Sequence, residues 1–269
     1  MLKDITLGQY FPGNSLIHRL DPRTKLIMLV VYIVALFMAT GWAAYGLLFV
    51  FLVCVIKIST IPMKSIVRGM KPLVLILVFT GILNIFFTTG EGEPLVDVWA
   101  VTIYKEGLIR AVFMVLRILL LISGTFLLTY TTSPIALTDG LESLLKPLKA
   151  IKVPVHELSM MMCIALRFIP TLIEETDKIM SAQKARGADF ESGRLLQRVK
   201  ALIPILVPLF ISAFRRADEL ATAMECRCYQ GGEGRTKMKM LRYHYRDFLC
   251  YGVGAVLLAG IIVMKRFGL

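Results

Sequence analysis

Residues 107–131, GLIRAVFMVLRILLLISGTFLLTYT, decide the fold, because this stretch is almost wholly apolar and carries only two charges, Arg110 and Arg117. A helix needs about 20 mostly apolar residues to cross the roughly 30 Å hydrocarbon core of a bilayer. Hydrophobic residues also make up 57% of the whole chain, against roughly 45–50% in soluble domains. The chain is therefore predicted to be an integral membrane protein.

The same criterion finds four further apolar runs, at residues 25–41, 42–57, 72–89 and about 248–264. Only Thr40-Gly41-Trp42 separates the first two runs. Together they hold about 30 apolar residues, too many for one span, so a tight helical hairpin is favoured. The predicted fold class is an all-α, polytopic membrane protein with about five transmembrane helices.

Basic residues predict the orientation, because cytoplasmic flanks of membrane spans are enriched in lysine and arginine. They precede the first span and follow the second, at Lys3, Arg19, Arg23, Lys25, Lys57, Lys64, Arg68 and Lys71. The N-terminus is therefore expected in the cytoplasm. The formal net charge of +12 comes from residues that flank apolar runs. This placement fits anionic lipid headgroups and does not indicate nucleic acid.

Three parts are expected along the chain: a transmembrane region of four spans at 1–131, a cytoplasmic region at 132–246, and a last transmembrane helix at 247–269. Residues 132–246 are dense in both charge signs and predict three amphipathic helices. The apolar stretches 159–173 and 201–214 within them are short for spans. Prolines at 170, 204 and 208 interrupt them further. These helices are expected to lie along the membrane base.

Two of these helices are predicted to end in an arginine between small residues, in Ala185-Arg186-Gly187 and in Cys226-Arg227-Cys228. An exposed guanidinium suits docking onto carboxylates or backbone carbonyls of another protein. The plainer interpretation is a cation that matches the dipole at a helix C-terminus, which stabilises the helix by roughly 0.3–1 kcal/mol. The repetition of the triplet favours docking.

Arg117 is the other candidate functional residue, and it follows Arg110 by seven positions in the same predicted span. A charge near the bilayer centre costs about 2.5–3.5 kcal/mol on insertion scales, so an inward-facing side chain is the default. Arg117 is then either a functional group or a structural partner within the bundle.

Several chemistries are not supported by any pattern in the chain. Residues 231–237, GGEGRTK, have the wrong spacing for a phosphate-binding loop, so this chain is not expected to hydrolyse ATP. Cys226 and Cys228, with His244 or His156, could in principle hold a metal ion, but small cysteines that pack a helix are favoured. No metal site and no cofactor are predicted for this chain, and it is not expected to be an enzyme.

Three segments together resemble the transmembrane T component of energy-coupling factor transporters. They are residues 12–25, PGNSLIHRLDPRTK; residues 167–172, RFIPTL, with 183–190, QKARGADF; and residues 223–229, AMECRCY. The family often has alanine and glycine beside the second arginine, where this chain has Cys226 and Cys228. The likeness covers essentially the whole chain.

That resemblance implies a multi-pass protein of a prokaryotic cell membrane that assembles with two ABC-type ATPases. ATP and Mg²⁺ would be bound in those ATPases, and a small membrane subunit, the S component, would capture the substrate. The resemblance assigns ATPase docking to Ala185, Arg186, Gly187, Cys226, Arg227 and Cys228. It implies uptake of vitamins or other micronutrients, and a T component shared among several vitamin-binding subunits is favoured.

Two other functions remain as alternatives at this stage. A self-sufficient secondary transporter would use Arg117 and Arg110 in a midplane substrate site, but it predicts internal repeats that the chain does not contain. A membrane-bound enzyme would need a catalytic set of side chains, and no such set is found in the sequence.

Overall fold

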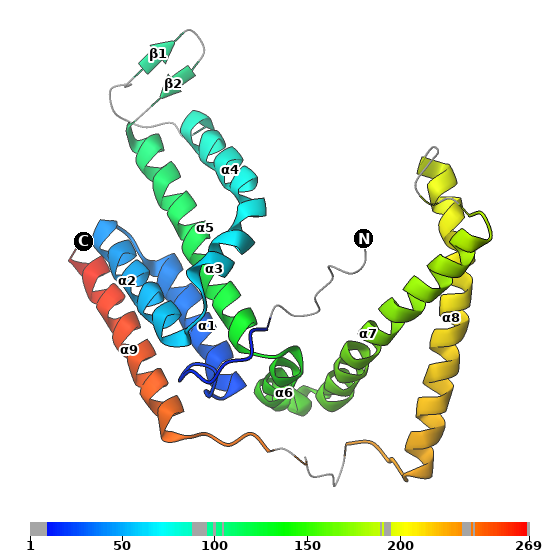
Figure 1. The fold of residues 1–269 in the computed structure, drawn as a ribbon. Helices are drawn as coiled ribbons and strands as arrows, with labels where there is room; N and C mark the ends of the chain where they lie inside the picture. The colour runs from blue at the N-terminus through cyan, green and yellow to red at the C-terminus, as the bar shows by residue number, and fades with distance from the viewer. Residues whose placement is uncertain are drawn as a thin grey trace. The chain divides into compact units, whose positions relative to one another are not determined.

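The computed structural model describes residues 10–87, 96–98, 101–103, 105–188, 190, 195–232, 238 and 240–267. Helices dominate these ranges (Figure 1). The predicted all-α class is confirmed. The described ranges also contain one short antiparallel hairpin, formed by β1 (Val96–Val98) and β2 (Val101–Ile103). The helices are α1 (Pro22–Met38), α2 (Trp42–Ser59), α3 (Met63–Met70), η2 (Lys71–Leu73), α4 (Val74–Phe87), α5 (Lys105–Thr131), α6 (Pro134–Leu145), η3 (Lys146–Ile151), α7 (Val155–Ala185), α8 (Leu195–Cys226) and α9 (Tyr245–Arg266).

The chain divides into two compact units. The first, called here the bundle, is formed by the described residues of Gly8–Leu141 and Leu241–Leu269. The second, called the helix pair, is formed by those of Glu142–Met240 and contains α7 and α8. The chain leaves the bundle within α6 and returns to it shortly before α9. The boundaries between the two units lie after Leu141, inside α6, and after Met240.

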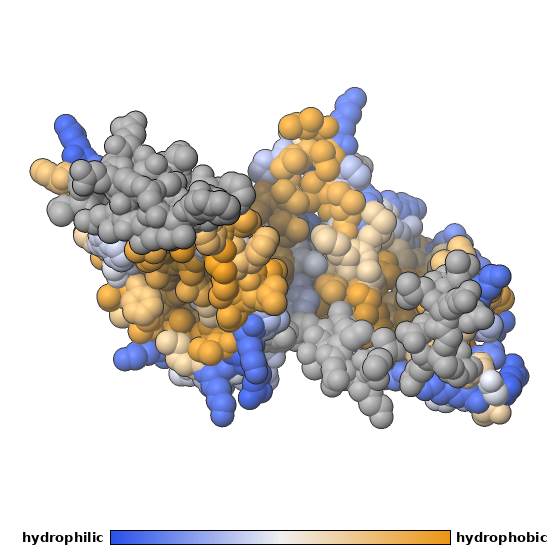
Figure 2. All heavy atoms as spheres, turned by 90° about the horizontal axis from the view of Figure 1, so that it is seen from above, coloured by the Kyte–Doolittle hydropathy of each residue, from blue (hydrophilic) through white to orange (hydrophobic). Residues whose placement is uncertain are grey.

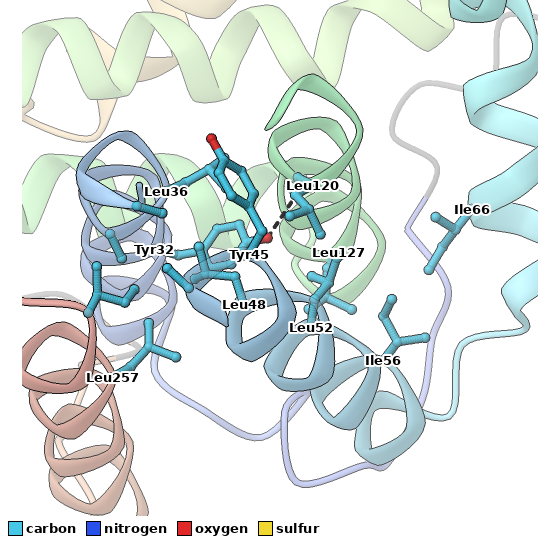
Figure 3. Packing of buried hydrophobic residues seen from close by; sticks show 14 of the residues in the cluster. Tyr32, Leu36, Tyr45, Leu48, Leu52, Ile56, Ile66, Leu120, Leu127 and Leu257 are labelled. Carbon is cyan, nitrogen blue, oxygen red and sulfur yellow. Dashed lines mark hydrogen bonds between the residues drawn. The ribbon is translucent and has the colours of Figure 1, made fainter. Parts of the chain in front are cut away.

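In the bundle, α5 packs against α1, α2, α3 and α4, while α9 packs against α1 and α2. The two helices of the predicted hairpin are present as α1 and α2, and three residues that include Gly41 at a φ of 96° separate them. A core of buried apolar side chains joins these helices (Figure 3). Leu36 and Leu48 are wholly buried in it, and the Tyr32 hydroxyl donates a hydrogen bond to the Leu120 carbonyl at 3.2 Å.

Five helical stretches in the described ranges are long and apolar enough to cross a membrane, which confirms the expected number. The set differs from the predicted one at one member. It comprises α2, the continuous stretch Met63–Phe86, α5, α7 and α9. Helix α1 has 17 residues, at the short end of the spanning range of about 17–25. Figure 2 shows broad areas of hydrophobic side chains on the surface, with hydrophilic ones in separate patches.

The helices of the helix pair continue through their prolines. Helix α7 continues through Pro170 for 31 residues, and α8 continues through Pro204 and Pro208 for 32 residues. An uninterrupted α7 is the reason that its length and composition suit a membrane span. Its mean hydropathy of 1.3 is nevertheless the lowest of the five. The three predicted amphipathic helices correspond to α6, α7 and α8.

Candidate functional site

Arg186 occupies the C-cap of α7, in a turn that the neighbouring glycine makes possible. Gly187 has a φ of +88°, a left-handed conformation that glycine adopts without steric cost. Its N–H donates to the Lys184 carbonyl at 3.0 Å, and the Ala188 N–H donates to the Gln183 carbonyl at 3.0 Å. This pair of bonds defines a Schellman motif. The cap ends the helix immediately after Arg186 and leaves the arginine exposed at its tip.

Arg227 occupies the equivalent position at the end of α8. The Cys228 N–H donates to the Glu225 carbonyl at 2.8 Å, and the Tyr229 N–H donates to the Met224 carbonyl at 3.0 Å. Cys228 takes the left-handed position with a φ of +55°. The two triplets therefore share one backbone geometry, with a cysteine where the first has a glycine. The helix ends at Cys226, so Arg227 lies at its end as predicted.

Both arginines are exposed and available to a partner. Among the residues that the structure describes, neither guanidinium forms a hydrogen bond or an ion pair. Ala185, Gly187, Cys226 and Cys228 beside them are exposed too. The geometry thus provides two small, cationic helix ends onto which another protein can pack closely.

A polar cluster, called here the clasp, connects α7 with α8. Glu175 of α7 accepts hydrogen bonds from the Ser212 hydroxyl and from Arg216 Nη2, the latter at 3.2 Å. Toward the end of α7, Gln183 Nε2 donates to the Pro204 carbonyl at 3.5 Å. The order of these contacts makes the two helices antiparallel. Arg186 and Arg227 therefore lie on opposite sides of the Glu175–Arg216 pair. At 1.5 Å per residue, Arg186 is about 16 Å along α7 from Glu175, and Arg227 is about 16 Å along α8 from Arg216.

Helix α8 also carries an exposed apolar stripe, defined by side chains that recur at intervals of three and four residues. Such spacing places them on neighbouring positions of a helix surface. A contiguous apolar surface of this kind is typical of a contact with another protein or with lipid. The stripe comprises Leu202, Ile203, Leu206, Val207, Phe210, Ile211 and Phe214, which are 46% to 68% exposed.

Arg117 belongs to the bundle and lies apart in the chain from the docking candidates. Its Nε donates to the Tyr45 hydroxyl at 2.8 Å, and its guanidinium lies 5.5 Å from the Phe37 ring centroid. The Phe113 ring is stacked on the Tyr45 ring at 5.1 Å between centroids, and it is tilted against the Trp42 ring at 4.6 Å. Phe37 is in the last turn of α1 and Tyr45 in the first turn of α2. Arg117 is therefore near the closed end of the hairpin, and this geometry favours its structural interpretation.

No group of three or more metal-binding side chains occurs within the described ranges. Cys226 and Cys228 are free and exposed. His156 bonds Glu142 at 3.2 Å, and His244 bonds the Arg242 carbonyl at 3.0 Å, so each ring has another partner than the cysteines.

Sequence reasoning missed two polar arrangements. The clasp was not predicted, because Glu175 and Arg216 lie far apart in the chain and only the antiparallel packing brings them together. Asp247 was missed as well: it is 1% exposed and accepts hydrogen bonds from the backbone N–H groups of Asp21 and His244. A carboxylate three residues after a helix start is a local signal for the second bond. No local signal indicates the first.

Comparison with known proteins gives matches over nearly the whole chain. Residues 13–238 match the family described as CbiQ, cobalt transport protein. The energy-coupling factor transporter transmembrane protein EcfT of Clostridium kluyveri is 56% identical over 266 residues, which cover 99% of this chain and 98% of that protein. The protein of the same name from Bacillus subtilis is 49% identical over 266 residues, which cover 99% of this chain and 100% of that protein.

Proposed function

The chain belongs to the family of energy-coupling factor transporter transmembrane proteins, and on that premise we propose that it transmits the energy of ATP hydrolysis from two ABC-type ATPases. The transported substrates are vitamins or other micronutrients, captured by a separate S component. Arg186 and Arg227 each dock one ATPase. ATP and Mg²⁺ bind in those partners, and the chain itself is a non-catalytic subunit of a prokaryotic cell membrane.

One observation carries this proposal: the two arginine triplets share the same Schellman cap at the exposed ends of two joined helices. A capped helix end holds the arginine in a fixed position, so less conformational entropy is lost when a partner binds. The guanidinium fork then has all its donors available for acceptors on that partner. Two equivalent tips suit two related ATPase subunits.

The apolar stripe on α8 supports the second partner, the S component. A small membrane protein presents an apolar surface of its own, which the stripe can cover. Met161 on α7 is 53% exposed and adds an adaptable side chain to the helix pair. We place α7 and α8 at the cytoplasmic membrane base, because charges such as Glu174, Asp177 and Lys178 populate the second half of α7.

The proposal is tested by Arg186→Ala, Arg227→Ala and the double variant, expressed with the ATPases and S components that copurify with the wild-type chain. Tritiated riboflavin, folate and biotin serve as a panel, and the vitamin that the wild type takes up is then followed. Each single variant is expected to lower uptake and ATPase copurification. The double variant is expected to abolish uptake, because no helix tip then carries the docking charge.

Arg215→Ala is the matched control, since it removes an exposed arginine from α8 away from either tip. It is expected to retain uptake. A double variant that keeps wild-type uptake and both ATPases, at normal protein levels, would refute the docking role.

A further inference from the structure

A five-residue stretch of the bundle, Asp21–Lys25, holds both places where the chain passes between the two units. The chain leaves the bundle at Leu141 and re-enters it at Leu241. The contacts of this stretch with both connections are made by residues of the bundle. The stretch also contains the start of α1, whose first turn is capped by the Asp21 carboxylate through a 2.9 Å bond from the Arg23 N–H.

On the outgoing side, Lys25 fixes the end of α5. Its ammonium is buried and donates to the Thr131 carbonyl at 2.9 Å, to Thr132 Oγ1 at 3.3 Å and to the His18 carbonyl at 3.3 Å. An ammonium has three N–H donors, so these acceptors satisfy the whole group. Burial of a charge is costly without such partners, so the three acceptors offset part of the cost of burying this ammonium.

The outgoing chain then packs against the same stretch at α6. Gly140 is buried, and a Cβ atom added there would lie 3.0 Å from Pro22 Cβ and 3.3 Å from the Pro22 carbonyl carbon. A Cβ atom at this position would make unusually tight contacts, so a glycine suits the close approach of the two backbones. Helix α6 is therefore seated on the first turn of α1 immediately before the chain leaves the bundle.

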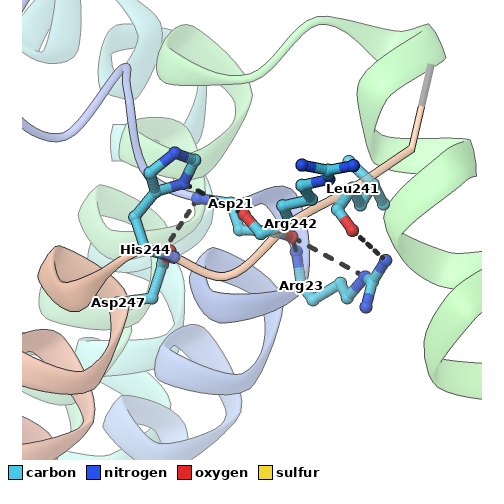
Figure 4. Close-up of polar contacts among 6 residues, drawn as sticks. All are labelled: Asp21, Arg23, Leu241, Arg242, His244 and Asp247. Atoms are coloured by element: carbon cyan, nitrogen blue, oxygen red, sulfur yellow. Dashed lines mark hydrogen bonds and ion pairs between the residues drawn. The ribbon is translucent and has the colours of Figure 1, made fainter.

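On the returning side, Arg23 and Asp21 fix the segment that leads into α9 (Figure 4). Arg23 Nη2 donates to the Leu241 carbonyl at 3.3 Å, and its guanidinium lies 5.1 Å from the Tyr243 ring centroid. The Asp21 N–H donates to Asp247 Oδ1 at 3.0 Å. Leu241 is the first residue of the bundle after the helix pair.

Asp247 connects this anchor to α9 itself. Its second oxygen, Oδ2, accepts from the His244 N–H at 2.8 Å at the start of that helix. The carboxylate is 1% exposed, so both oxygens are used in a buried position. Removal of one partner from such a network leaves the other group without compensation. The starts of α1 and α9 are thereby held together by one buried group.

We propose that Asp21, Arg23, Lys25 and Asp247 form a mechanical joint that fastens both connections of the helix pair to the first turn of α1. The inference rests on the proposed coupling function and assigns these four as positioning residues. Because both connections end on one short helical turn, a displacement of the helix pair is delivered to α1 and the helices packed on it. Without the joint, the connecting segments absorb that displacement.

The test uses the complete complex in liposomes and compares Arg23→Ala and Asp247→Asn with the wild type. Two quantities are measured: the ATPase rate, and the uptake of the vitamin chosen with the wild-type complex from the riboflavin, folate and biotin panel. Both variants are expected to retain the copurified ATPases and an ATPase rate within about twofold of the wild type. Uptake per ATP hydrolysed is expected to fall about tenfold or more. Arg23→Lys, which keeps the positive charge, is expected to retain part of the wild-type uptake per ATP hydrolysed.

Arg242→Ala is the matched control, because Arg242 is exposed and directly follows Leu241. It is expected to leave uptake per ATP unchanged. Unchanged uptake per ATP in Arg23→Ala, or ATPase rate and uptake that fall in parallel, would overturn the joint. If Asp247→Asn yields too little complex, Arg23→Ala decides alone. A failure of the docking proposal can be told apart from a failure of the joint. The docking proposal is tested by whether the Arg186 and Arg227 variants lose or retain the ATPases, whereas the joint is tested by uptake per ATP.

Discussion

The bundle and the helix pair differ in what happens to their apolar side chains. In the bundle, α1, α2, α5 and α9 bury a continuous cluster that includes Leu36, Leu48 and Ile261, all 0% exposed. In the helix pair, Val155 and Ile205 are the buried hydrophobic residues within the described ranges. Large side chains such as Phe210 and Phe214 are exposed instead.

This difference indicates where each unit obtains its stability. The bundle is held by its own close packing, where loss of even a few methylene groups is felt. The helix pair is held by the clasp, by its two caps and by surfaces that remain available to partners. A body built in this way suits transmission of movement, because its contacts can be exchanged without exposing a core.

The largest expected effect is the loss of a core side chain from the bundle. Leu48→Ala should lower the free energy of unfolding by about 2–5 kcal/mol, because it leaves a cavity among helices that cannot collapse fully. Unfolding of the purified chain in mixed detergent and sodium dodecyl sulfate measures this loss. Val50→Ala on the same helix is the control. Val50 is 59% exposed, and its change is expected to stay within about 0.5 kcal/mol. Equal losses at both positions would contradict the assigned core.

Substitutions at the two left-handed cap positions should have smaller effects on stability, and the two effects should have opposite signs. A non-glycine residue in this conformation costs roughly 1–2 kcal/mol. Cys228→Gly should therefore strengthen its cap, and Gly187→Ala should weaken the other by a similar amount. Hydrogen exchange of the Tyr229 and Ala188 amides reports these changes, with protection altered about 5–30-fold. Protection that falls in both variants would show that the caps are not equivalent.

Disruption of the clasp should change the geometry of the helix pair more than its helical content. Glu175→Gln removes the negative charge that pairs with Arg216 while it keeps the size of the side chain. Spin labels placed at Ser181 and Thr222, both exposed, should report a broader distance distribution across α7 and α8. Glu174→Gln, at the exposed neighbouring position, should leave the distribution unchanged. Identical distributions in both variants would remove the clasp as a determinant of helix spacing.

The smallest effect on stability is expected for the apolar stripe. Phe214→Ser alters a side chain that is 68% exposed, so the free energy of unfolding should change by no more than about 0.5 kcal/mol. Copurification of the S component should nevertheless decrease, since the stripe is proposed to contact it. A large loss of stability would mean that Phe214 is part of a core within this chain.

Much of the fold was predictable from local patterns in the chain. Apolar length predicted the helices that became α2, α5 and α9. The aspartate and proline at the start of α1 are local signals as well. The proline of α7 was misleading as a sign against a membrane span, because a proline removes one backbone hydrogen bond but neighbouring turns can keep a long helix continuous. For the candidate site, the positions of Arg186 and Arg227 at helix ends were predictable. Their shared Schellman geometry was not, because a left-handed Cys228 has no sequence signal.

The amino-acid sequence alone determined that this is a helical membrane protein with two arginine-tipped helices, because hydrophobic length and capping residues act over a few neighbouring positions. Only the tertiary structure decided which distant groups meet: Glu175 with Arg216, Arg117 with Tyr45, and Asp21 with Asp247. These pairs depend on how helices pack, and packing is selected by the shape of whole surfaces. A local pattern specifies a helix, whereas its partners follow from the complete set of helices.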